Sequence, residues 1–123
     1  MAYSPGRVTA LPLSEALLQS AVIEHLRAYG DPQWLWWHTP NEGKRSAITG
    51  AHLKRQGMRA GVGDLSLLHQ GRYYELELKT AKGRLQDAQR ERQNAVLAAG
   101  GMAEVTFGLD DALGVLKAWG ALR

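Results

Sequence analysis

The sequence predicts a single α/β domain in which helices flank a small mixed β-sheet, in the order α-β-α-β-β-α-β-α. Three observations predict this class. The chain has 123 residues, which is the size of one domain. Segments with the hydrophobic spacing of helices alternate with short strand-like runs, as in a sheet covered by helices. Two of those runs flank a short turn and therefore predict a β-hairpin.

Capping and chain-breaking residues set the ends of the expected elements. After an extended lead-in at residues 1–13, Ser14 is a suitable N-cap for the first helix, and Gly57 is a suitable stop for the second. We interpret the aromatic run at 34–38 as a central strand. The expected elements are a helix from Ser14 to Gly30, a strand at 34–38, a helix at 46–56, strands at 64–68 and 73–79, a helix at 85–99, a strand at 103–107 and a helix at 109–119.

Composition excludes several classes of protein. The chain has no cysteine, so it has neither disulfides nor thiolate zinc sites. No apolar run reaches the roughly 18 residues that a membrane span requires. The first residues lack a basic region followed by an unbroken apolar core, which is the pattern of a signal peptide. We therefore expect a cytoplasmic protein that does not associate with membranes.

Positive charge is concentrated between Gly43 and Gly63. The net charge is +3, but this segment contains five Lys or Arg residues and no acidic residue, namely Lys44, Arg45, Lys54, Arg55 and Arg59. Two interpretations are open. The segment is either a solvated face or a surface that contacts nucleic-acid phosphates, since Lys and Arg release counterions from such a backbone.

The hairpin carries the candidate chemistry. Side chains alternate along a strand, so Glu75, Glu77 and Lys79 share one face, and the leucines between them share the other face, which we expect to pack against helices. A turn at residues 70–71 places Asp64 opposite Glu77. The sequence therefore predicts two neighbouring carboxylates beside an ammonium group.

Two carboxylates that lie opposite each other on neighbouring strands repel each other unless a cation lies between them. Oxygen ligands without cysteine or paired histidines favour a hard cation such as Mg²⁺ or Mn²⁺. The alternative is a salt-bridged cluster on a solvent-facing sheet. Glu75 shares the face of Glu77 and either binds a second metal or points outward at the sheet edge; we favour the outward orientation.

A longer pattern surrounds the hairpin. It consists of Gly-Val-Gly-Asp-Leu at 61–65, Glu-x-Lys thirteen residues beyond the aspartate, and Lys-Gly-Arg-Leu-x-x-x-Gln at 82–89. Together with Ser14-Glu15 and Gln19 in the first helix and Asn-Glu-Gly-Lys-Arg at 41–45, this pattern resembles the VRR-NUC branch of the PD-(D/E)XK nuclease superfamily. The resemblance covers most of the chain and implies a restriction-endonuclease-like core.

The resemblance also implies roles for individual residues. Asp64 and Glu77 would bind the metal, Lys79 would be the catalytic lysine, Glu15 would be the acidic residue that the first helix adds to the metal site, and Gln89 would lie close to the active centre. This chain departs from the family at Gly63, where a proline is common. That change removes a rigid lead-in to the aspartate.

We therefore expect a Mg²⁺- or Mn²⁺-dependent, structure-specific DNA endonuclease. The basic segment would grip the DNA backbone together with Lys82 and Arg84. Small stand-alone members of the family look like junction-cleaving homodimers, so the resemblance implies branched DNA such as a four-way (Holliday) junction as the substrate. If that is the substrate, the two cuts that it requires predict a homodimer. The alternatives are a flap or nicking nuclease that acts as a monomer, and a non-catalytic nucleic-acid-binding module that keeps the fold.

Two further patterns in the sequence allow other interpretations. His38, Asn41 and His52 suggest an HNH nuclease, but the expected helix at 46–56 begins too early for that motif, so we disfavour it. The tryptophans at 34, 36 and 37 either stack on unpaired bases or pack in a core or dimer interface, and we favour packing.

Overall fold

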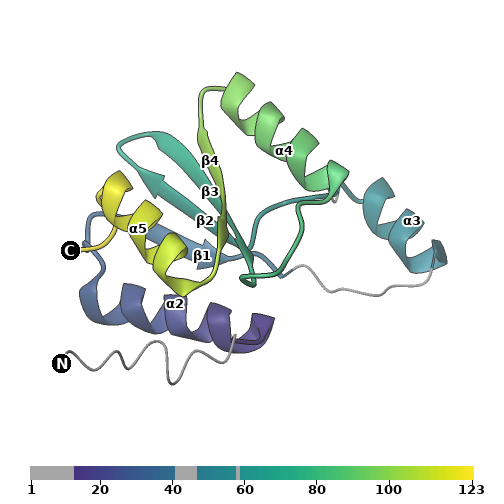
Figure 1. The fold of residues 1–123 in the computed structure, drawn as a ribbon. Coiled ribbons are helices and arrows are strands. Elements are labelled where there is room, and N and C mark those ends of the chain that lie inside the picture. The colour runs from purple at the N-terminus through teal and green to yellow at the C-terminus, as the bar shows by residue number, and fades with distance from the viewer. Residues whose placement is uncertain (1–12, 41–46, 58) are drawn as a thin grey trace.

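The structure is a computed structural model that describes residues 13–40, 47–57 and 59–123 (Figure 1). The predicted order of elements is confirmed. The elements are α2 (Glu15–Tyr29), β1 (Leu35–His38), α3 (Ala47–Arg55), β2 (Leu65–His69), β3 (Arg72–Lys79), α4 (Asp87–Ala98), β4 (Met102–Phe107) and α5 (Leu109–Trp119). Apart from Leu13, the predicted lead-in lies outside the described residues. No helix in the described ranges is both long and apolar enough to cross a membrane.

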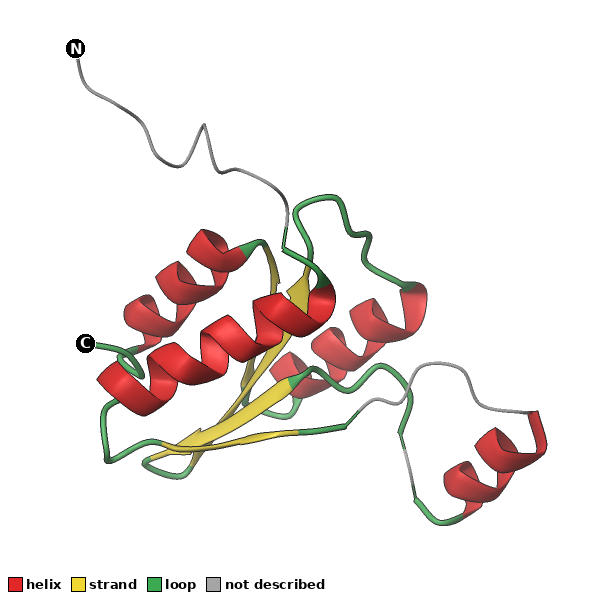
Figure 2. Ribbon diagram, turned by 90° about the horizontal axis from the view of Figure 1, so that it is seen from below, coloured by secondary structure: helices red, strands yellow, loops and turns green. Residues whose placement is uncertain are grey.

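The four strands form one mixed sheet in the order β1-β2-β3-β4. β1 and β3 are antiparallel to β2, whereas β4 is parallel to β3 and follows it through the α4 crossover. Figure 2 shows the strands running between the helices. The predicted small mixed sheet flanked by helices is therefore confirmed, and β2 and β3 occupy its centre.

The placement of the aromatic run at 34–38 in a central strand was wrong. Among the described strands, β1 lies at the edge of the sheet and pairs with β2 alone. One face of the run packs against the core. Trp34 is buried there and stacks on His69 with ring centroids 4.4 Å apart, and Trp36 is partly buried on the same face. On the other face Leu35 is 60% exposed and Trp37 is 41% exposed. The preference for packing over base stacking therefore holds for Trp34, which belongs to the core.

A two-residue turn sets the register of the central hairpin. Gln70 and Gly71 both have positive φ, 50° and 79°, as the tight turn that suits the twist of two antiparallel strands requires. The pairing runs from His69 opposite Arg72 to Leu65 opposite Leu76. This is the register that the sequence predicts, and it brings the residue before β2 to the level of Glu77.

The apolar face of the sheet packs against α2 and α5. Leu65, Leu67 and Leu76 are fully buried there. Ser14 caps α2 by accepting a hydrogen bond from the Leu17 backbone N–H at 3.2 Å. The two helices contribute buried residues at helical spacing, namely Leu18, Val22 and Leu26 from α2, and Ala112 and Leu116 from α5.

The opposite face of β3 is polar and yet buried. α4 packs beside β4, with Val96 buried and the Gln93 side-chain amide donating to the Ala103 carbonyl at 3.2 Å. Glu75 and Glu77 are only 4% and 8% exposed. The alternative of a salt-bridged cluster on a solvent-facing sheet is therefore wrong, because this part of the face is covered.

The approach to Asp64 is packed so closely that it requires glycine. Gly61 has φ +76°, and a Cβ there would lie 2.2 Å from the Ala88 carbonyl oxygen. A Cβ on Gly63 would lie 2.8 Å from Cγ of Glu75 and 3.0 Å from the Leu76 carbonyl oxygen. The departure from proline at position 63 therefore has a steric reason in this chain.

Gly63→Ala is expected to destabilise the protein by about 1–3 kcal/mol, because the added methyl group forces β3 or its glutamate to move. The matched control is Gly114→Ala in α5, where a Cβ would meet nothing within 4 Å. That change should stabilise the helix by about 0.5–1 kcal/mol. Urea unfolding measures both, and equal effects of the two substitutions would contradict the close approach at Gly63.

Candidate functional site

A cavity of about 360 Å³ lies where the N-termini of α2 and α4 meet the ends of β1, β2 and β3. The five residues to which the family resemblance gives active-site roles all line it, namely Glu15, Asp64, Glu77, Lys79 and Gln89. They come from four separate segments of the chain. The fold therefore gathers the whole predicted set at one place.

Asp64 is held through both its backbone and its side chain. Its carbonyl oxygen accepts hydrogen bonds from the Thr39 backbone N–H at 2.9 Å and from His38 Nδ1 at 2.8 Å. Its Oδ2 accepts a hydrogen bond from the Leu78 backbone N–H at 2.7 Å. One carboxylate oxygen is thus anchored to β3, and Oδ1 accepts no hydrogen bond from the described residues.

Glu77 is held on one oxygen only. Its Oε2 accepts a hydrogen bond from Gln89 Nε2 at 2.5 Å and lies 3.4 Å from Lys79 Nζ. Its Oε1 is buried and has no hydrogen-bond partner among the described residues. Buried polar atoms without a partner are rare in folded proteins, since the loss of water is not compensated. This oxygen is therefore a candidate ligand atom.

The electrostatics of Glu77 also indicate a site for a cation. Burial raises the pKa of the Glu77 carboxyl, and the neighbouring Asp64 carboxylate raises it further, whereas Lys79 lowers it. The pKa settles at about 8, so the lysine alone does not offset desolvation and repulsion. A divalent cation at this pair would favour the ionised carboxylate.

The donor set fits a hard divalent cation. Asp64 and Glu77 offer carboxylate oxygens, one of them unpartnered, and such cations prefer oxygen ligands. Glu15 is exposed in the first turn of α2 and lines the same cavity. Within the described ranges, however, no three His, Asp or Glu side chains are gathered closely enough to hold an ion. The third acidic ligand therefore stays a prediction.

The expected outward orientation of Glu75 at the sheet edge was wrong. β3 is an interior strand, and Glu75 lies beneath α4, where Arg92 Nη2 contacts its Oε1 at 3.0 Å. Arg92 Nε lies 3.3 Å from each carboxylate oxygen, and the Tyr73 hydroxyl donates to Oε1 at 2.5 Å. In this arrangement both oxygens have protein partners, so Glu75 is not available as a metal ligand.

Sequence reasoning gave no role in the site to two polar residues of the cavity wall. His38 and Gln19 both line the cavity, the first from the end of β1 and the second from α2. His38 was considered only as part of an HNH motif, although its ring binds the Asp64 carbonyl. The signal that would reveal it is the pairing of His38 with Leu65 across β1 and β2, which the sequence alone does not supply.

Five of the seven predicted DNA-binding residues belong to the described part of the chain, and these five lie outside the cavity wall. Lys54 and Arg55 are exposed in the last turn of α3, a helix that stands apart from the sheet in Figures 1 and 2. Arg59 is exposed in the following segment, and Lys82 and Arg84 are exposed in the connection between β3 and α4. The remaining two, Lys44 and Arg45, lie outside the described residues.

Comparisons with known proteins bear on the fold. A solved structure described as a VRR_NUC domain protein matches with a TM-score of 0.70 and 22% identity, over 87% of this chain and 88% of that one. A second, described as a VRR_NUC domain, matches with a TM-score of 0.56 and 16% identity, over 85% and 96%. The chain has the VRR-NUC fold. No protein-family model and no curated protein matches the sequence. The VRR-NUC fold is the one that the sequence resemblance implied.

The raised pKa of Glu77 predicts how stability depends on pH. The unfolded carboxyl titrates near 4.5 and the folded one near 8, so between these values the folded state binds the extra proton. The stabilising contribution is complete below about pH 4.5 and is lost as the pH rises to about 8. Glu77→Gln cannot ionise and should abolish this loss.

The measurement is urea unfolding of both proteins from pH 5 to pH 9 in the presence of a chelator. The free energy of unfolding of Glu77→Gln should rise relative to that of the unsubstituted protein up to about pH 8 and then stay level. Asp64→Asn should weaken the pH dependence, because it removes the neighbouring negative charge. Parallel profiles for all three proteins would contradict the assignment.

Proposed function

We propose that this chain is a divalent-metal-dependent endonuclease that hydrolyses DNA phosphodiester bonds, with Mg²⁺ or Mn²⁺ bound by Asp64 and Glu77. The observation that carries the proposal is the buried, unpartnered Oε1 of Glu77 beside Asp64 and Lys79 in one cavity. A carboxylate pair that the fold desolvates and leaves undercompensated is suited to a cation. The VRR-NUC fold supports the same conclusion.

The residues of the cavity have different roles in the proposed hydrolysis. Asp64 and Glu77 would hold the cation, which would supply Lewis-acid chemistry, polarising the phosphate and lowering the pKa of a water molecule. Gln89 and Lys79 hold Oε2 of Glu77, and this leaves Oε1 for the cation. The Lys79 ammonium, whose side chain is 12% exposed, is also placed to stabilise negative charge that develops on a phosphoryl oxygen in the cavity.

DNA would reach the cavity along basic surfaces. The exposed cations of α3, together with Arg59, Lys82 and Arg84, contact phosphates in this proposal, and phosphate contacts position DNA without reading its sequence. We therefore propose cleavage that depends on the structure of the DNA, with four-way junctions as the substrate. One copy of the chain supplies one Asp64–Glu77 pair, so two symmetric cuts require a two-fold dimer.

Asp64→Asn and Lys79→Ala are each expected to abolish Mg²⁺-dependent cleavage of a labelled four-way junction, by at least about a hundredfold. The first removes a ligand charge, and the second removes the ammonium group of the cavity. Binding of the junction in a gel-shift assay should change little for either variant. The comparison includes flap, splayed-arm, nicked and linear duplexes.

Other outcomes separate the alternatives. Cleavage of flaps or nicks by a species that sediments as a monomer would overturn the junction and dimer parts of the proposal. If no branched, flapped or single-stranded substrate is cut with Mg²⁺ or Mn²⁺ but DNA is bound, the chain is a binding module and the nuclease proposal is wrong.

The proposed DNA surface predicts a specific salt dependence. The double substitution Lys54→Ala and Arg55→Ala should weaken junction binding and reduce the slope of log Kd against log salt concentration by about 1 to 2. The reason is that a protein with fewer phosphate contacts releases fewer counterions when it binds. The matched control is the double substitution Arg27→Ala and Lys117→Ala, which removes two exposed charges in the last turns of α2 and α5. An equal effect of the control would show that only net charge matters.

A further inference from the structure

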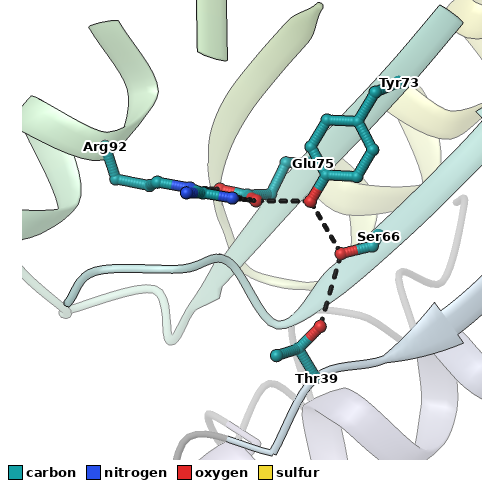
Figure 3. Close-up of polar contacts among 5 residues, drawn as sticks. All are labelled: Thr39, Ser66, Tyr73, Glu75 and Arg92. Carbon is teal, nitrogen blue, oxygen red and sulfur yellow. Dashed lines mark hydrogen bonds and ion pairs between the residues drawn. The ribbon is translucent and has the colours of Figure 1, made fainter. Parts of the chain in front are cut away.

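A chain of hydrogen bonds crosses the polar face of the sheet from α4 to the end of β1 (Figure 3). It begins at the Arg92–Glu75 ion pair and continues through the Tyr73 hydroxyl to Ser66 at 2.8 Å. From Ser66 it reaches the Thr39 hydroxyl at 3.3 Å. We call these five residues the positioning network; two of its members, Ser66 and Glu75, are 2% and 4% exposed and are shielded from water.

The ion pair fixes the direction of every hydrogen bond in the positioning network. The Glu75 carboxylate can only accept, so the single hydroxyl hydrogen of Tyr73 is used there. Ser66 must therefore donate to the Tyr73 oxygen, and Thr39 must donate to Ser66. Burial and the Glu75 carboxylate raise the pKa of Tyr73, so its hydroxyl keeps this hydrogen. Each hydroxyl of the network therefore donates its hydrogen to the next residue on the way to Glu75.

Both ends of the positioning network lead to Asp64. Thr39 donates its backbone N–H to the Asp64 carbonyl at 2.9 Å, and the hydroxyl of the same residue anchors it to Ser66. Gly63, which precedes Asp64, lies so close to the Glu75 side chain that a Cβ would be 2.8 Å from its Cγ. The backbone on either side of the Asp64 carboxylate is therefore held by this network.

We infer that Glu75, Arg92, Tyr73, Ser66 and Thr39 are positioning residues that hold Asp64 where its carboxylate meets Glu77. They do not contact the cation or the DNA themselves. The inference rests on the proposed function only in giving Asp64 a divalent cation to bind. Partners that orient a ligand commonly change metal affinity about 10- to 100-fold when they are removed.

The test uses the full chain with Tyr73→Phe and Thr39→Val, which keep the shape of each side chain but remove its hydroxyl. Thr39→Ser keeps the hydroxyl and is the conservative variant. Leu113→Ala, in the partly buried part of α5, is a control for loss of stability alone. Three quantities are measured, namely the Kd for Mn²⁺, kcat and KM on junction DNA, and the amide proton shift of Leu78 in the metal-free protein.

The Leu78 amide reports Asp64 directly, because its N–H donates to Asp64 Oδ2. In Tyr73→Phe and Thr39→Val, the Kd for Mn²⁺ should rise about tenfold and kcat should fall by a similar factor, while KM changes little. The Leu78 shift should move toward its value in Asp64→Asn. Thr39→Ser should restore all three quantities, and Leu113→Ala should change none of them.

Unchanged Mn²⁺ affinity and an unmoved Leu78 amide in both hydroxyl-deleted variants would overturn the inference, even if their stability falls. A protein that cuts no DNA but shows the predicted shifts and Mn²⁺ affinities would overturn the proposed function and support the positioning role. If the unsubstituted protein does not bind Mn²⁺, the Leu78 amide alone decides, and an unmoved amide counts against the inference.

Discussion

The candidate site depends on the register of the β2–β3 hairpin. The tight turn at Gln70–Gly71 brings Asp64 to the level of Glu77, and the Leu78 backbone N–H binds its carboxylate. A shift of one residue would turn every side chain of β3 to the opposite face. The leucines that pack on α2 and α5 would then exchange places with the glutamates. The core therefore enforces the pairing on which the two carboxylates depend.

Two buried glutamates on the same strand face have different environments, and this difference assigns their roles. Glu75 is matched by Arg92 and Tyr73, which occupy both of its oxygens. Glu77 has Lys79 and Gln89 on one oxygen, has no hydrogen-bond partner on the other among the described residues, and lies beside a second carboxylate. Removing a carboxylate from water is unfavourable in both cases, but only Glu75 is compensated within the described chain. The undercompensated glutamate lines the cavity, and the compensated one supports it.

Local signals were sufficient to predict the order of elements and the hairpin, because N-caps, glycine stops and alternation depend on neighbours in sequence. The environment of Glu75 was not predictable in this way, since its partner Arg92 lies seventeen residues away on a helix whose angle across the sheet is set by packing. The edge position of β1 and the contact of His38 with Asp64 likewise depend on which strands pair. The candidate set at 15, 64, 77, 79 and 89 came from the resemblance, and the structure brings all five to one cavity.

Gly63 shows how the site and its support constrain each other. A proline before the aspartate would stiffen the backbone, but its ring atoms would occupy the space that Cγ of Glu75 and the Leu76 carbonyl fill. In this chain the Asp64 backbone is held instead by hydrogen bonds from Thr39 and His38 to its carbonyl. Glycine at 63 and the buried ion pair at Glu75 therefore depend on each other, because the absence of a Cβ at 63 leaves the space that the Glu75 side chain occupies. A bulkier residue at 63 would displace Glu75 and disturb its hydrogen bond to Tyr73. Through Tyr73 and Ser66, this change would loosen Thr39, whose backbone N–H holds the Asp64 backbone in the absence of a proline at 63.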